Sequence, residues 1–284
     1  ASFVKYGPDD DAIGAGFFSG RYSATLVAAG SVARTILRKC GIEVFSYIKE
    51  MAGVRAGDVD HATALKMYND YCRMRRDHDP FYQEVFVNGR LRPDMRFLEK
   101  MKVLAEIEGE INDIRAKAPK MTREGVLESH GVHHVVNCPD TDAAHEMLEA
   151  CNKITKTGDS SGGIVEVVAL GVPTGLGEPV FSKLDGELGR MLGIGAVKGV
   201  EVGAGFGVKD MTGSQSNDQI SCEDGKVTFD TNNAGGVTGG LATGQPVVAR
   251  LAVKPTPTID KPQHTIDKYT HEKKDLAAIT RRDP

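Results

Sequence analysis

The sequence predicts an α+β fold built on an antiparallel sheet. Helical and strand-like stretches both occur along its 284 residues, but they lack the regular strand–helix alternation that is typical of a parallel α/β sheet. Of the 33 glycines, 21 lie between Gly158 and Gly244, which indicates tight turns and short elements in that part. The length corresponds to about one or two domains and is sufficient to bury a core.

Three helices are expected from the spacing of apolar residues. Small and apolar residues recur at helical spacing from Leu26 to Cys40, and Gly41 is a natural C-terminal stop. A second helix is expected from about Asp142, where an acidic first turn suits the helix dipole. A third should follow Pro179, a residue favoured in the first turn, and its apolar face is Val180, Leu184, Leu188 and Leu192.

Strands are expected where β-branched, aromatic or alternating apolar residues gather. These stretches are 42–48, 164–170 and 247–253, together with a short strand at Val135-Val136. The segment from His61 to His130 differs, because it has only three glycines and shows helical patterning around Phe97 to Ile107. We interpret it as an inserted helical subdomain or hairpin; the alternative is a helical interaction module that recruits a partner.

Charge and cysteine content restrict the function class. A net charge of -4 gives no footprint for nucleic acid or for an anionic membrane. The charge is uneven, since residues 131–249 carry 7 basic and 15 acidic side chains and residues 250–284 carry 8 and 5. Five widely spaced cysteines favour reduced thiols in a cytoplasmic protein. No stretch is typical of a membrane span or a signal peptide.

The most informative stretch runs from Thr231 to Thr258. It places two glycine pairs and Gly244 just before an alternating strand, which ends in Lys254-Pro255-Thr256-Pro257-Thr258. Glycines let a backbone approach a flat or anionic ligand closely, and the tail offers a cation and two hydroxyls on a stiffened backbone. We expect a site for a phosphate-bearing cofactor or substrate.

Two other glycine-rich motifs favour plainer interpretations. Gly158-Asp159-Ser160-Ser161-Gly162-Gly163 is similar to the serine-protease motif GDSGG, but an extra serine breaks the spacing and no matching histidine context accompanies it. A tight turn entering the next strand is preferred. Gly203-Ala204-Gly205-Phe206-Gly207 is a partial dinucleotide fingerprint without a strand–turn–helix context, because Ser214 to Asp224 is polar and turn-like. A glycine-rich turn is expected there.

Two further clusters carry side chains that could bind a metal or an anion. His130, His133, His134 and Cys138 do not have a standard zinc spacing, so no metal is expected and a loop leading into the Val135-Val136 strand is preferred. Arg281, Arg282 and Asp283 form either a solvated tail or a group that recognises phosphate and handles protons.

Taken together, four segments carry a resemblance to the chorismate synthase family, and the resemblance as a whole extends over roughly two-thirds of the chain. They are Gly16–Arg34 (GFFSGRYSATLVAAGSVAR), Gly158–Phe206 (GDSSGGIVEVVALGVPTGLGEPVFSKLDGELGRMLGIGAVKGVEVGAGF), Asn232–Ile259 (NNAGGVTGGLATGQPVVARLAVKPTPTI) and the terminal RRDP. NCPD at Asn137–Asp140 fits the family as well.

The resemblance implies a fold in which helices are sandwiched between antiparallel sheets, in a homotetramer. It implies a 1,4-anti elimination of phosphate from 5-enolpyruvylshikimate-3-phosphate to give chorismate in the shikimate pathway. The reaction requires reduced FMN, with the reductant supplied externally or by NADPH. A dry, preorganised site suits such chemistry.

The resemblance also implies the site residues. The expected flavin contacts are Phe17, Phe18, Ser19, Gly195, Ala196, Gly239, Lys254, Pro255, Thr256, Pro257, Thr258 and Arg281. Arg21 and Arg281 are expected substrate contacts, and Asp283 is expected to take part in proton transfer at the flavin.

The chain departs from the family pattern at several places. Phe17 and Phe18 replace a common Arg-Ser, Arg282 replaces the histidine of RHDP, and the segment 61–130 is longer than is usual. Residues 1–284 are expected to form a single family-like domain truncated at both ends, without the FGESHG and GHAD histidines and the helix after RHDPC. Such a fragment should bind FMN weakly and show no turnover; the alternative is a catalytically impaired flavin-binding homologue.

Overall fold

The computed structural model describes residues 23–77, 86–87, 90–91, 127–128, 131–267 and 269–276. The chain divides into two compact units, the first formed by Ala1–Arg55 and Glu149–Pro284 and the second by Ala56–Leu148. Both contain helices, and every described strand pair is antiparallel. The predicted α+β class is therefore confirmed.

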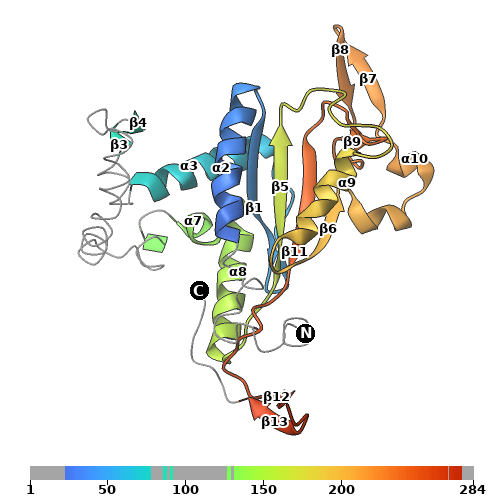
Figure 1. Cartoon of the computed structure of the whole chain (residues 1–284). Coiled ribbons are helices and arrows are strands. Elements are labelled where there is room, and N and C mark those ends of the chain that lie inside the picture. The colour runs from blue at the N-terminus through green and yellow to red at the C-terminus, as the bar shows by residue number, and fades with distance from the viewer. Residues whose placement is uncertain are drawn as a thin grey trace, which may run out of the picture. The chain divides into compact units, whose positions relative to one another are not determined.

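A five-stranded sheet dominates the first unit, with the strand order β2-β1-β5-β11-β6 (Figure 1). The strands are β1 (Glu43–Met51), β2 (Val54–Arg55), β5 (Gly163–Leu170), β6 (Val197–Val202) and β11 (Val247–Val253). The three strand stretches expected at 42–48, 164–170 and 247–253 are thus confirmed. Strand β11 enters the sheet between β5 and β6, which precede it in the sequence.

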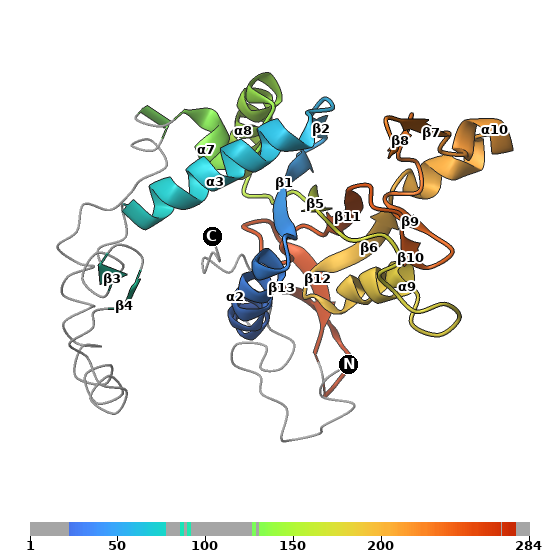
Figure 2. The same cartoon turned by 90° about the horizontal axis from the view of Figure 1, so that it is seen from above.

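Two helices cover one face of this sheet, as Figure 2 shows. They are α2 (Ser23–Lys39) and α9 (Leu184–Gly189), the latter continued by a 3₁₀ turn at Arg190–Gly193. Leu37 of α2 and Leu184 and Leu188 of α9 pack on the same buried cluster, which includes Ile42 and Val247. This packing follows from the strand alternation, which places every second side chain on one face.

An ion-pair cluster joins α2 to β1. Glu43, the first residue of β1, accepts hydrogen bonds from Arg38 Nη2 at 2.6 Å and from Arg34 Nη2 at 2.7 Å. The Arg38 hydrogen bond is the main reason that the pKa of Glu43 lies below its ordinary value, and Arg34 adds to it against the opposing effect of burial. Gly41 closes the connection with a φ of 81°, as expected for a helix stop.

A row of polar side chains crosses the middle of the sheet in register. Tyr47 faces Glu166, Glu166 faces Arg250, and Arg250 faces Glu201. The Tyr47 hydroxyl donates to Glu166 Oε1, and Arg250 lies 3.7 Å from Glu166 Oε2 and 3.5 Å from Glu201 Oε2. Glu166 is 5% exposed, so its charge depends on these partners for compensation.

The first unit also contains several short elements. Tight turns connect them, as the glycine content predicted. They are a 3₁₀ turn (Gly205–Asp210), α10 (Gly213–Ser216), β7 (Ile220–Glu223), β8 (Lys226–Phe229), β9 (Val237–Thr238), β10 (Leu241–Ala242), β12 (Gln263–Ile266) and β13 (Lys273–Leu276). Strands β7 and β8, β9 and β10, and β12 and β13 form three hairpins.

The second unit is described for α3 (His61–Asp77), α7 (Val132–Val136) and the short strands β3 (Phe86–Val87) and β4 (Arg90–Leu91). Helix α8 (Thr141–Lys156) confirms the helix expected from Asp142. Asp140 of the NCPD segment accepts from Ala143 N at 3.1 Å in the manner of an N-cap, and from Gly57 N at 2.8 Å. The patterning around Phe97 to Ile107 lies outside the described residues.

Three local expectations were wrong. The third helix begins at Leu184 rather than after Pro179, because Val180 has a φ of 80°, which no helix accepts. Val135-Val136 belongs to α7 rather than to a strand. The polar stretch from Ser214 to Asp224 contains the end of α10 and the strand β7, so it is more than a turn.

No helix in the described part of the chain combines the length and the apolar character that crossing a bilayer requires.

Replacing Arg250 with methionine should destabilise the fold. The variant keeps a long side chain but leaves the buried Glu166 carboxylate without its cation, and we expect a loss of about 3–5 kcal/mol in the free energy of unfolding at pH 7. Urea titration followed by circular dichroism measures this loss. The control is Lys209→Met, which breaks an exposed pair with Asp210 and should change stability by less than about 0.5 kcal/mol. An equal loss of unfolding free energy in the two variants would contradict a stabilising role for the row of polar side chains.

Candidate functional site

Two segments predicted to contact a cofactor lie side by side at the end of β11. Lys254 follows the last residue of that strand, and its backbone N–H donates to the carbonyl of Ala196 at 2.9 Å. Ala196 has a φ of 71°, a left-handed conformation that is uncommon for a residue with a Cβ and that often marks functional sites. The pairing of β11 with β6, which joins Val253 to Val197, brings Gly195-Ala196 and Lys254 together.

The segment Pro255–Thr258 is exposed, and Lys254 is half-buried. Within the described ranges, no side chain hydrogen bonds to the hydroxyl of Thr256 or Thr258, and no carboxylate pairs with the Lys254 ammonium group. The segment therefore presents a cation and two hydroxyl donors to solvent, which is the donor set that an anionic or phosphate-bearing ligand needs.

The GDSSGG motif contacts this segment. Gly158 has a φ of 74°, and β5 begins at Gly163, so the expected tight turn entering a strand is confirmed. The Ser160 hydroxyl donates to the carbonyl of Thr256 at 2.7 Å, and Asp159 forms an ion pair of 2.6 Å with Lys261. The motif supports the Lys254–Thr258 segment.

The second glycine motif, GAGFG, is a glycine-rich turn, as expected. Gly203 (φ 59°) packs against the Asn232–Gly236 loop so closely that a Cβ would lie 2.1 Å from the Asn233 carbonyl oxygen and 2.4 Å from Gly235 N. Gly235 is equally close to Gly203. In this loop, the glycines therefore permit two protein backbones to touch, rather than leaving room for a ligand.

Asp218 stabilises the Asn232–Gly236 loop. Its carboxylate accepts from Asn233 N at 2.6 Å, from Ala234 N at 2.9 Å and from the Thr231 hydroxyl at 2.6 Å. Burial acts to raise the pKa of Asp218, but the hydrogen bonds from Thr231, Ala234 and Asn233 outweigh it and hold the pKa below its ordinary value. These two backbone N–H groups are thus already occupied by a protein anion.

Gly239 lies away from the other cofactor candidates. It is at the tip of the β9–β10 hairpin with a φ of 64°, and a Cβ there would meet nothing within 4 Å, so its backbone is open to a ligand. The hairpin adjoins the start of β11, where Gly236 lies against Pro246, whereas Lys254 follows the end of β11 (Figure 1). The seven residues of β11 separate the two places by about 20 Å.

The remaining predicted site residues lie outside the described residues. They are Phe17, Phe18, Ser19, Arg21, Arg281 and Asp283. His130, one of the weighed metal ligands, also lies outside them. Across the part of the chain that the structure describes, no group of three or more His, Cys, Asp or Glu side chains is placed to hold a metal ion.

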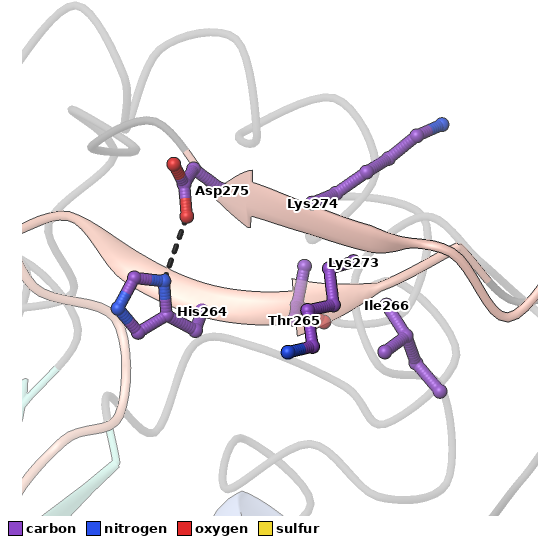
Figure 3. Close-up of a pocket in the computed structure, with 6 residues that line it drawn as sticks. All are labelled: His264, Thr265, Ile266, Lys273, Lys274 and Asp275. Atoms are coloured by element: carbon purple, nitrogen blue, oxygen red, sulfur yellow. Dashed lines mark hydrogen bonds and ion pairs between the residues drawn. The ribbon is translucent and has the colours of Figure 1, made fainter.

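An open hollow lies on the β12–β13 hairpin (Figure 3) and contains none of the predicted site residues. Its lining residues are His264, Thr265, Ile266, Lys273, Lys274 and Asp275. His264 Nδ1 lies 2.7 Å from Asp275 Oδ1 across the hairpin. The lining belongs to one exposed two-stranded hairpin, which offers little enclosure for a small molecule.

Sequence reasoning missed the supporting residues Asp159, Ser160, Lys261 and Asp218. The sequence of the GDSSGG motif predicts only a turn, because nothing local connects the motif to a segment almost 100 residues later. The strand alternation of 164–170 and 247–253 was a usable signal, since adjacent pairing of these two strands brings Gly163 opposite Val253.

Comparison with known proteins identifies the family. The sequence pattern of the chorismate synthase family matches residues 1–284, and the chain therefore belongs to the chorismate synthase family. It is 37% identical over 285 residues to a chorismate synthase of Acetivibrio thermocellus, covering 99% of this chain and 57% of that protein. It is 49% identical over 177 residues to a chorismate synthase of Methanosarcina mazei, covering 62% of this chain and 47% of that one.

A crystal structure of a chorismate synthase has the same fold. It matches with a TM-score of 0.59 at 24% identity, over 89% of this chain and 61% of that chain. The chain thus spans 57% and 47% of the length of the two curated relatives named above.

Substituting Asp218 with asparagine should lower stability in a pH-dependent way. The variant loses the charge that strengthens three hydrogen bonds, and at pH 7 we expect a cost of about 1–2 kcal/mol. Because the folded pKa is depressed, the contribution of Asp218 is fully present above the unfolded pKa of about 3.9. It is lost as the pH falls through the lower folded value.

Urea unfolding from pH 3 to pH 8 measures this difference. The difference in free energy of unfolding between the wild type and Asp218→Asn should be constant at neutral pH. This gap should become smaller in acid. Asp224→Asn, in the exposed β7–β8 turn, serves as the control and should show no such gap. A gap that widens in acid would contradict the assigned direction of the pKa shift.

Proposed function

We propose that this chain carries part of the active site of a chorismate synthase. The proposed reaction is the 1,4-anti elimination of phosphate from 5-enolpyruvylshikimate-3-phosphate, which yields chorismate and requires reduced FMN. The observation that carries the proposal is the contact between Ala196 and Lys254, which brings together two separate segments that the family resemblance assigned to the flavin. Membership of the family supplies the reaction class, that of a lyase.

The residues at the end of β11 fit FMN. Lys254 supplies a half-buried cation, Thr256 and Thr258 supply exposed hydroxyls, and the left-handed backbone at Ala196 presents main chain at the same place. Gly195, Pro255 and Pro257 would complete this surface. The reduced flavin, when bound, supplies electron density to the breaking C–O bond.

The chain's own residues would bind and orient anions. The substrate carries two carboxylates and a phosphate, so the pocket needs several cations in a partly dry environment, where each is worth more than in water. Lys254 is one such cation. Arg21 and Arg281 are the further expected substrate contacts, with Arg281 also at the flavin, and Asp283 is expected to move a proton there.

Gly239 could contact a ligand, but at a different place from Lys254. Its open backbone suits close approach of a ligand, but it lies at the opposite end of β11 from Lys254. The proposal also includes Phe17, Phe18 and Ser19 as flavin contacts, NADPH or an external reductant, a homotetramer and a cytoplasmic location. These parts rest on the family resemblance alone.

Replacing Lys254 with alanine should weaken FMN binding. The substitution removes a charge-assisted contact worth on the order of 1.5–3 kcal/mol, which corresponds to an increase of roughly 10- to 150-fold in Kd. Titration of flavin fluorescence measures this. Lys273→Ala, on the exposed strand β13, is the matched control and should leave the Kd unchanged. An unaltered titration for Lys254→Ala would remove Lys254 from the site.

Replacing Asp283 with asparagine should slow turnover and leave flavin affinity nearly unchanged. A positioned general acid or base contributes about 10²- to 10⁴-fold to a rate, so kcat should fall by at least the lower of these factors. Stopped-flow measurement of chorismate formation with reduced FMN, alongside the flavin titration, tests this in a full-length protein that catalyses the reaction. A wild-type kcat for this variant would eliminate the proton-transfer role.

A further inference from the structure

After Lys254, whose N–H donates to the Ala196 carbonyl, the segment to Thr258 has few backbone donors to hold it in place. Pro255 and Pro257 have no N–H to donate, and the stretch from Pro255 to Thr258 is exposed. Beyond the Lys254 N–H, its hydrogen bonds in the described part of the chain are made through carbonyl oxygens. The Ser160 hydroxyl donates to the Thr256 carbonyl at 2.7 Å, and Gln263 Nε2 donates to the Pro257 carbonyl at 3.2 Å.

These carbonyl contacts leave the threonine hydroxyls available. A ligand bound at the segment would use the side chains of Thr256 and Thr258 and the ammonium group of Lys254, none of which is engaged by another described side chain. Ser160 therefore fixes the backbone without competing for the groups that would contact the ligand. Ser161, the neighbouring hydroxyl, donates to the carbonyl of Gly162 at 3.2 Å.

Two glycines of GDSSGG allow this support to come close. A Cβ on Gly162 would lie 2.5 Å from the Val253 carbonyl oxygen and 3.1 Å from Pro255 Cδ. A Cβ on Gly158 would lie 3.0 Å from Asp260 Cβ, and the Gly158 carbonyl accepts from Asp260 N at 2.8 Å. The Gly158–Gly162 turn thus contacts the segment at its beginning, its middle and just beyond its end.

An ion pair joins the turn to the chain just after the Lys254–Thr258 segment. Lys261 Nζ lies 2.6 Å from Asp159 Oδ2, although the two residues are 102 positions apart. The hydrogen bond from Lys261, followed by that from Ser160 N, holds the pKa of Asp159 below its ordinary value, so the Asp159 carboxylate stays charged at neutral pH. Both side chains are partly exposed (44% for Lys261 and 36% for Asp159). Such a pair contributes little to global stability, but it can restrict a local segment.

We propose that Asp159, Ser160 and Lys261 are positioning residues that hold Lys254–Thr258 ready for its ligand. The inference rests on the proposed function only for the identity of that ligand, FMN. Holding the segment in one conformation reduces the ordering cost at the moment of binding, which raises affinity without any new contact to the ligand. The GDSSGG motif thereby affects ligand binding through the segment that it supports, without contacting the ligand.

Two substitutions in the full chain test the proposal, Ser160→Ala and Lys261→Met. The first readout is hydrogen exchange at the Asp260 amide without FMN, because that amide is protected by its bond to the Gly158 carbonyl. Both variants should accelerate it. The second readout is the Kd for FMN, which should rise roughly two- to tenfold for Ser160→Ala, the size expected for one hydrogen bond. For Lys261→Met the rise should be about threefold, as for an exposed ion pair.

Conservative and matched variants separate positioning from general destabilisation. Lys261→Arg keeps the ion pair and should restore both readouts. Lys274→Met breaks the Asp267–Lys274 pair, which has a similar length of 2.7 Å but lies at the β12–β13 hairpin, and it should leave both readouts at wild-type values.

Wild-type exchange at Asp260 in both test variants would overturn the inference, and so would faster exchange with an unchanged Kd for FMN when Lys254→Ala does weaken FMN binding. Failure of the proposed function gives a different result. In that case Lys254→Ala also leaves FMN binding unaltered, while the exchange measurement still decides whether Asp159, Ser160 and Lys261 hold the segment.

Discussion

Strand β11 pairs on both sides, with β5 and with β6, and the arrangement of the candidate site depends on this double pairing. The pairing with β6 places Ala196 beside Lys254. The pairing with β5 brings Gly163 opposite Val253, so that the GDSSGG turn lies behind the same segment. A slip of one residue in either ladder would turn the β11 side chains to the other face of the sheet and separate these neighbours.

The buried polar row fixes that register. Tyr47, Glu166, Arg250 and Glu201 come from four adjacent strands and meet only when all three ladders are correctly aligned. An isolated carboxylate at the position of Glu166 would be costly, so alternative registers that separate it from Arg250 are disfavoured. The same arginine donates to the Gly203 carbonyl, which connects the row to the glycine-rich loops.

Glycine has two different uses in this chain. At Gly203, Gly235 and Gly162 the absence of a Cβ allows two protein segments to touch, because the nearest atom that a Cβ would meet is a backbone atom of the same chain. At Gly239 the surrounding space is open, which suits a ligand. From the sequence, Gly235 and Gly239 belonged to one expected ligand site, whereas turns were expected at Gly162 and Gly203; composition does not reveal what each glycine faces.

The sequence by itself determined the α+β class, the helices at α2 and α8, the three long strands β1, β5 and β11, and the family resemblance. These features depend on local periodicity or on motifs, which are readable without the fold. The sequence-based prediction of a helix directly after Pro179 was wrong, because this favoured first-turn residue is followed by the positive φ of Val180. The prediction of a strand at Val135-Val136 was also wrong, because these two β-branched residues lie in a short helix.

Only the tertiary structure decided that Lys254 adjoins Ala196, that Gly239 lies at the other end of β11, and that Asp159 pairs with Lys261. The physical reason is that these contacts join residues far apart in the sequence, and strand pairing and register bring such residues together. Register is set by the combined burial of a whole sheet face rather than by any short stretch of residues.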